Sequence, residues 1–133
     1  MTLAVERRWL QAAVLIAICV PIGAGGAGVV LGPGFVEGWT AIASQDSHFR
    51  YLSGLLLGIG LCYAAAVPRN EAHAARFRLL TAIVFVGGLA RLGSLLAAGA
   101  PAGGMIFGLA MELAVTPAIC LWQNSFARRH GSG

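Results

Sequence analysis

The sequence predicts an all-α integral membrane protein, a four-helix transmembrane bundle with both termini in the cytoplasm. Three observations support this fold class. Of the 133 residues, 58% are hydrophobic and only 11% are charged, whereas a soluble domain carries about 25% charged residues. The apolar residues gather in four runs, each close to the length of about 20 residues that a helix needs to cross a bilayer. The basic residues stand mostly at the ends of these runs, where they mark the sides of the membrane.

The length allows one small domain, which we expect over residues 1–130, with residues 131–133 as a tail. The expected spans lie at about residues 9–31, 48–67, 77–98 and 104–124. The first span follows a basic start, as in a signal peptide, but its apolar run is longer than a signal core, so we interpret it as a retained span. Pro21 predicts a kink in this span, and Pro68 marks the end of the second span.

The arginines are distributed unequally between the two sides of the predicted bundle. All nine basic residues are arginine. One side holds Arg7, Arg8, Arg69, Arg76, Arg78, Arg128 and Arg129. The connections on the other side hold none apart from Arg50. Because cytoplasmic loops are enriched in basic residues, this pattern places both termini in the cytoplasm. The net charge of +4 therefore reflects topology, and we expect no nucleic-acid partner.

The longest connection, Gly32 to Ser47, lies on the outer side. Phe35, Trp39 and Ile42 follow one another at helical spacing. This spacing fits a short helix lying in the membrane interface. An ordered loop and a lid over a site are the alternatives that the sequence leaves open.

Two charged residues lie inside the third and fourth apolar runs. A charge at the centre of a membrane helix costs roughly 2.5–3.5 kcal/mol on insertion scales, so a partner is expected. Arg91 is seven residues from the outer end of its run, a depth of about 10 Å, and Glu112 is about 12 Å from its own outer end. Since neighbouring antiparallel helices would bring these residues level, we expect Arg91 and Glu112 to face each other.

A second pair of charges stands above the first. Asp46 and Arg50 are four residues apart, which places them on the same side of a helix within reach of each other. His48 and Ser94 are further polar candidates at this depth. We therefore predict one polar cluster in the outer half of the bundle, formed by Asp46, Arg50, Arg91, Glu112, His48 and Ser94.

This cluster has three interpretations, and the residues alone leave all three open. An Arg–Glu pair fixes the register between two helices. Paired arginines also suit a carboxylate or phosphate ligand. Glu112 with Arg91 would serve acid–base chemistry if burial raised the pKa of the carboxyl group, although a neighbouring arginine acts in the opposite direction.

No motif predicts a cofactor or a metal site. Cys19, Cys62 and Cys120 are far apart, and each lies inside an apolar run, so we expect small buried packing residues. A metal site from His48, Asp46 and a cysteine has no supporting spacing. The chain contains no phosphate-binding loop, nucleophile elbow or zinc-protease motif.

Three segments carry a resemblance to a known family: QDSHFRYLSGLLLGIGL, GGLARLGSLLAAG, and MELAVTP followed by LWQ. They resemble the family of small four-helix bacterial membrane proteins catalogued as domain of unknown function 4345, over about residues 10 to 125. The resemblance implies a four-helix bundle in the bacterial inner membrane. It also implies that Asp46, Arg50, Arg91 and Glu112 occupy motif positions, and it supplies no activity.

The sequence thus predicts a multi-pass inner-membrane protein that is more a binding protein than an enzyme. We expect it to bind a lipid-like or small anionic ligand, or a partner protein, through the outer polar cluster. The alternatives are an isomerase-like acid–base enzyme that uses Glu112 with Arg91, and a small transporter subunit. Membrane lipid is an expected partner, and the glycine-rich helix faces also suit a homo-oligomer.

Overall fold

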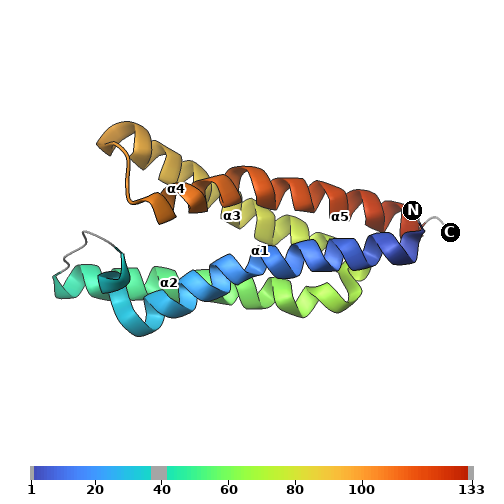
Figure 1. Ribbon diagram of the computed structural model, residues 1–133, viewed down its shortest axis with the longest axis horizontal. Coiled ribbons are helices and arrows are strands. Elements are labelled where there is room, and N and C mark those ends of the chain that lie inside the picture. The colour runs from blue at the N-terminus through green and yellow to red at the C-terminus, as the bar shows by residue number, and fades with distance from the viewer. Residues whose placement is uncertain (1, 37–41, 132–133) are drawn as a thin grey trace.

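A computed structural model describes residues 2–36 and 42–131, and all the regular secondary structure among these residues is helical (Figure 1). The elements in chain order are α1 (Leu3–Leu31), η1 (Gly32–Phe35), α2 (Ala43–Ala66), η2 (Val67–His73), α3 (Ala74–Ala98), α4 (Gly103–Ala110), η3 (Met111–Val115) and α5 (Thr116–Gly131). The elements η1 and η2 are 3₁₀ helices, and η3 is a π-helical turn. The all-α class predicted from the sequence is confirmed.

Within the described residues, three helical stretches are long and apolar enough to cross a membrane, where the sequence predicted four separate spans. They are Leu3–Phe35, Ala43–Ala98 and Gly103–Gly131. The middle stretch contains both the second and the third predicted spans, because the segment around Pro68 forms a 3₁₀ turn and not a loop. Arg69 leaves the helical region there, with φ −131° and ψ 56°. The chain reverses direction at this turn, so that α3 runs back alongside α2 (Figure 1).

The outer connection is shorter than predicted. Helix α2 begins at Ala43, so the charged residues Asp46 and Arg50 lie on its first two turns. Phe35 ends η1 and packs edge-on against Phe49 of α2, with ring centroids 6.0 Å apart. Ile42 is exposed immediately before α2. Trp39, the third member of the predicted interfacial helix, lies outside the described residues.

Helices α1 and α2 pack closely through small residues. Gly25 of α1 is buried against Leu57, and a Cβ atom added to it would lie 2.6 Å from the Leu57 nitrogen. Gly60 of α2 is buried against Ile22 in the same way. Such contacts let helix backbones approach where lipid supplies no hydrophobic drive for association. A Cβ atom added to Gly58, two residues before Gly60, would meet nothing within 4 Å, so Gly58 lies off this contact.

The apolar core lies at the end of the bundle where the two termini meet (Figure 1). Its buried residues are Leu10, Val14, Ile18, Tyr63, Ala66, Val67, Phe77, Leu80 and Phe126. Tyr63 packs against Phe77 with ring centroids 5.4 Å apart, and its hydroxyl shares a 2.8 Å hydrogen bond with Thr81. The core residues come mainly from α1, α2, α3 and α5, so these four helices are held together at this end, which we call the inner end.

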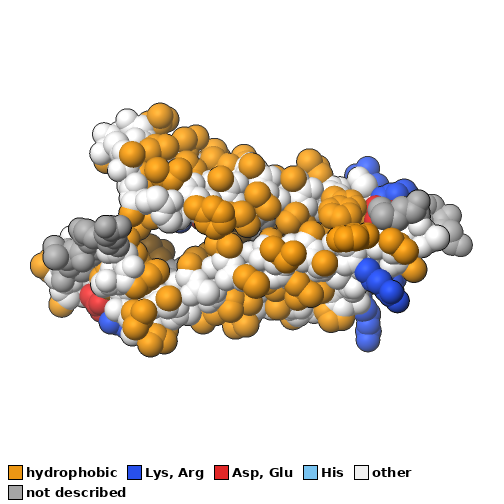
Figure 2. Space-filling view, in the orientation of Figure 1, with side chains coloured by type: hydrophobic (Ala, Val, Ile, Leu, Met, Phe, Trp, Pro, Cys, Tyr) orange, Lys and Arg blue, Asp and Glu red, His pale blue; other side chains and the backbone are white. Residues whose placement is uncertain are grey.

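The opposite end, the outer end, is splayed. Helices α1 and α2 stay together there, while α3 and α4 diverge from them (Figure 1). The space-filling view is hollowed between these two halves (Figure 2). The residues of the predicted polar cluster all belong to this half of the molecule, so the splaying decides which of them meet.

Candidate functional site

Arg91 and Glu112 form a bidentate ion pair between α3 and η3. The Arg91 Nε donates to Glu112 Oε2 at 3.0 Å, and its Nη2 donates to Oε1 at 3.0 Å. The Glu112 side chain is 15% exposed and the Arg91 side chain 34% exposed. Paired N–H···O bonds between a guanidinium and a carboxylate are among the strongest hydrogen bonds in proteins. The pair therefore fixes α3 and η3 in one register.

A glycine on α3 makes this approach possible. Gly88 lies one turn before Arg91 and is buried against η3. A Cβ atom added to Gly88 would lie 2.9 Å from the Glu112 Cβ and 2.7 Å from Leu113 Cδ2. Any larger residue at this position would push η3 away and lengthen the ion pair.

Glu112 stands in a π-helical turn rather than in a regular α-helix. The Thr116 N–H donates to the carbonyl of Met111, five residues earlier. Pro117 is the next residue. It has no N–H to donate to the Leu113 carbonyl, and its ring would clash with that carbonyl in a regular α-helix. Single π-helical turns occur frequently at functional sites, so the position of Glu112 is notable.

The second pair, Asp46 and Arg50, caps helix α1. Arg50 Nε donates to Asp46 Oδ2 at 2.8 Å, and Arg50 Nη1 donates to the carbonyls of Val29 and Val30 at 2.7 and 3.0 Å. The last carbonyls of a helix have no partner within the helix, and Arg50 supplies one. Gly32 has φ +68° and lies against both side chains, where a Cβ atom would be 2.6 Å from each. Arg50 thereby holds the end of α1 on the start of α2.

The four charges of the predicted cluster thus form two pairs. Among the residues that the structure describes, no hydrogen bond or ion pair joins Asp46 or Arg50 to Arg91 or Glu112. Ser94 is exposed on α3.

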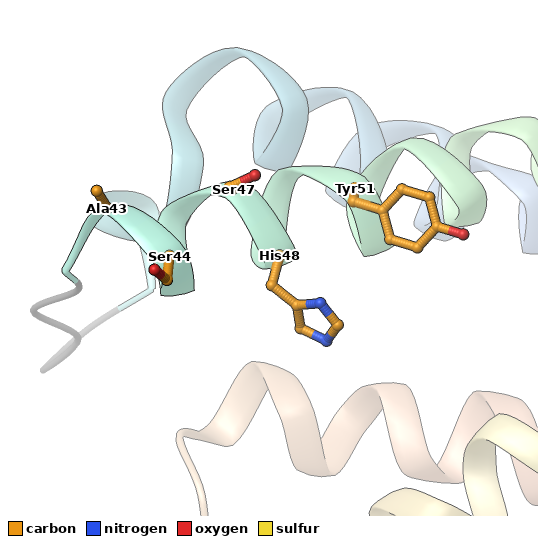
Figure 3. A pocket seen from close by; sticks show the side chains of 5 residues that line it. All are labelled: Ala43, Ser44, Ser47, His48 and Tyr51. Carbon is orange, nitrogen blue, oxygen red and sulfur yellow. The ribbon is translucent and has the colours of Figure 1, made fainter.

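An open groove lies beside the start of α2, with a volume of about 630 Å³. It is lined by Ala43, Ser44, Ser47, His48 and Tyr51, all on α2. We call it the outer groove. The His48 ring points across the gap toward the helix that begins with α4 (Figure 3). The His48 and Tyr51 ring centroids are 6.5 Å apart. The groove therefore presents two hydroxymethyl groups, an imidazole and a phenol at the mouth of the splayed outer end. Of the predicted site residues, His48 is the one that the structure places in it.

The described residues contain no group of three or more His, Cys, Asp or Glu side chains that could hold a metal ion. The cysteines differ from their predicted burial. Cys120 is buried, whereas Cys19 and Cys62 are exposed. Their helix faces do not point into the core, because the packing faces follow the glycines of α1 and α2.

The family model described as "Domain of unknown function (DUF4345)" matches residues 9–123. The chain belongs to this family. No curated protein and no solved structure matches it. The matched region contains the two ion pairs of the outer half and the groove, and it ends before the C-terminal arginines.

A polar network at the inner end was not predicted from the sequence. Glu6 is buried on α1, and its Oε1 accepts hydrogen bonds from Trp122 Nε1 at 3.0 Å and from Arg129 Nη2 at 2.5 Å. Arg7 donates to Glu71 Oε1 at 2.6 Å. These bonds join the start of α1 to η2 and to α5. The available signal was spacing, since Glu6 precedes the core residue Leu10 by four positions and shares its helix face.

The same end contains buried polar atoms with no protein partner. Gln123 Nε2 donates to the Asn70 carbonyl at 2.6 Å, and both residues are fully buried. The two side-chain polar atoms of Asn70, the Oε1 of Gln123 and the Oε2 of Glu71 make no hydrogen bond in the structure. Buried polar groups of this kind usually bind water. The inner end therefore combines the apolar core with a polar seam between η2 and α5.

Proposed function

We propose that the protein is a multi-pass protein of the bacterial inner membrane that binds a lipid-like molecule at its outer end. The topology within this proposal has four crossings and cytoplasmic termini. Helices α2 and α3 have 24 and 25 residues. At the rise of an α-helix they are about 36 and 37 Å long, enough to cross a hydrocarbon layer of about 30 Å with some tilt. The arginines at the inner end support its placement in the cytoplasm.

The proposal of a lipid-like ligand rests on a single observation, the groove at the start of α2. A lipid-like molecule has a polar head and an apolar body, and the outer end offers a surface for each. The polar head would contact Ser44, Ser47, His48 and Tyr51. The neighbouring elements carry large exposed apolar side chains, among them Leu55 on α2, Leu89 on α3 and Ile106 on α4. The apolar body would lie between these helices, where they diverge.

The charges favour a lipid-like ligand over a small anion. Arg50 and Arg91 would be the anion-binding groups, but each already donates to a carboxylate. Within the described residues of the outer half, no arginine is left without an acidic partner. A head group that exchanges hydrogen bonds with hydroxyl and imidazole groups suits this neutral surface better.

The structural role of the Arg91–Glu112 pair is part of the same proposal. Both oxygens of Glu112 accept bonds from Arg91, so a substrate would have to compete with Arg91 for the carboxylate. The π-helical turn at Glu112 is the observation that favours the second candidate function, acid–base catalysis of the isomerase type. The partner-protein and small-transporter alternatives have no comparable observation in their favour.

Mass spectrometry of the protein purified in mild detergent tests the proposal. The wild-type protein should carry an amphiphile that survives purification. The combined variant Ser44→Ala, Ser47→Ala and His48→Leu should lose most of it, because these side chains are exposed groove residues that the fold does not need. Ser125→Ala, an exposed serine at the inner end, serves as the control and should keep it. Equal amounts of the same molecule in all three proteins would refute the groove as the site.

A further inference from the structure

Six of the seven arginines at the inner end, all except Arg128, fall into two groups. Arg7 pairs with Glu71, Arg129 with Glu6, and Arg78 donates to Asn124. Three others are exposed: Arg8, Arg69 and Arg76. In the part of the chain that the structure describes, no hydrogen bond or ion pair involves the guanidinium group of any of these three. Both carboxylates of this end already hold arginines, so the charge of the three is not neutralised by the protein.

Arg8 of α1 and Arg69 of η2 stand next in the chain to residues that form one seam between these two elements. Gln11 Nε2 donates to the carbonyls of Val67 and Pro68, at 3.0 and 3.4 Å. Arg8 is three residues before Gln11, about one helical turn away on a neighbouring part of the same face. Arg69 directly follows Pro68. A second contact on the same seam, from Arg7 to Glu71, keeps the start of α1 against η2.

Arg76 lies outside this seam. It is on the first turn of α3, next to the buried core residue Phe77. It carries the same charge as Arg8 and Arg69 and is also exposed. The chain therefore supplies a matched control for any effect that depends on charge alone. Basic side chains project at the inner end of the space-filling view (Figure 2).

We propose that Arg8 and Arg69 bind the phosphate of an anionic phospholipid at the inner membrane surface. Guanidinium groups match phosphate oxygens with two parallel hydrogen bonds, and arginine suits this role better than lysine. Basic sites between helices on the cytoplasmic side are typical positions for such head groups. Trp9, 62% exposed beside Arg8, belongs at the head-group level of a membrane. The lipid's chains would then extend along the apolar surface of the bundle. The leaflet follows from the proposed topology, while the site itself does not depend on the outer groove.

Lipid titration monitored by native mass spectrometry tests this site. Detergent-solubilised full-length protein is titrated separately with phosphatidylglycerol and with phosphatidylcholine of the same chain length. The wild-type protein should bind the first phosphatidylglycerol at least tenfold more tightly than phosphatidylcholine. Arg8→Gln and Arg69→Gln should each remove most of this preference, whereas Arg76→Gln should leave it within twofold. Arg8→Lys with Arg69→Lys should retain only part of it, because the charge remains without the planar fork.

Three results would overturn the proposal. A wild-type protein with no preference for phosphatidylglycerol removes the site. An equal loss in Arg8→Gln, Arg69→Gln and Arg76→Gln means that only the summed surface charge matters. Displacement of phosphatidylglycerol by 10-fold excess inorganic phosphate means that the site takes a small anion and not a lipid. The groove variant of Ser44, Ser47 and His48 should keep the preference, so failure of this site and failure of the outer groove are distinguishable. Circular dichroism confirms that each variant is folded.

Discussion

Removing one partner of the Arg91–Glu112 pair should destabilise the protein far more than removing both. Glu112→Leu leaves a guanidinium facing an apolar side chain, and Arg91→Met leaves a carboxylate that is 15% exposed in the wild-type protein. Two charge-assisted bonds of 3.0 Å are lost in each case. At about 1.5–3 kcal/mol for each bond to a charged group, the loss is about 3–6 kcal/mol. Because Arg91 is one third exposed, we expect the lower end, about 3 kcal/mol for each single change.

The double variant Arg91→Met, Glu112→Leu buries no unpaired charge and should lie within about 1 kcal/mol of the wild type. The free energies of unfolding are measured by denaturant titration in detergent micelles, followed by circular dichroism. Ser94→Ala, one turn from Arg91 and exposed, is the control and should change stability by less than about 0.5 kcal/mol. If the effects of the two single changes simply add in the double variant, the two side chains are not energetically coupled. That result would refute the assignment of this pair as the element that fixes α3 on η3.

Three further predictions follow from the packing. Gly25→Ala should destabilise the protein by about 1–3 kcal/mol, because the new Cβ atom would lie 2.6 Å from the Leu57 nitrogen. Gly26→Ala is the control: its Cβ atom would meet nothing within 4 Å, so it should be neutral or stabilising in the same titration. Arg50→Met should lower the free energy of unfolding by about 1–3 kcal/mol, because the carbonyls at the end of α1 lose their donor. The end of α1 should also lose hydrogen-exchange protection, and unchanged protection there would contradict the capping role. Trp122→Phe removes one donor to the buried Glu6 and should cost about 1 kcal/mol, measured as a shift of the denaturation midpoint; no shift would mean that Arg129 alone satisfies the carboxylate.

The contacts that the sequence predicted well are those set by helical geometry alone. Asp46 and Arg50 meet because four residues make about one turn. Arg91 and Glu112 meet because their distances from the outer ends of two antiparallel helices are nearly equal. Both arguments need only the rise and the period of an α-helix, which the apolar runs already imply.

The contacts that the sequence did not predict depend on the path of the backbone. Arg50 reaches the carbonyls of Val29 and Val30 because the chain turns at Gly32, where φ is positive. The bond from Trp122 to Glu6 joins residues 116 positions apart. The outer groove exists because α3 and α4 diverge from α2, and no local pattern encodes the divergence of two helices. Pro68 was expected to end a span, and α2 does end just before it, at Ala66. The tight 3₁₀ turn that reverses the chain there, with Arg69 outside the helical region, was not expected.

The account's central claim is that the outer groove beside α2 holds a lipid-like molecule. The most direct measurement is mass spectrometry of the molecule that copurifies with the wild-type protein and with the variant Ser44→Ala, Ser47→Ala, His48→Leu. The account predicts an amphiphile in stoichiometric amount in the wild-type protein and a loss of at least tenfold in the folded variant. A bare wild-type protein, or an equal amount of the same molecule in both proteins, would contradict it.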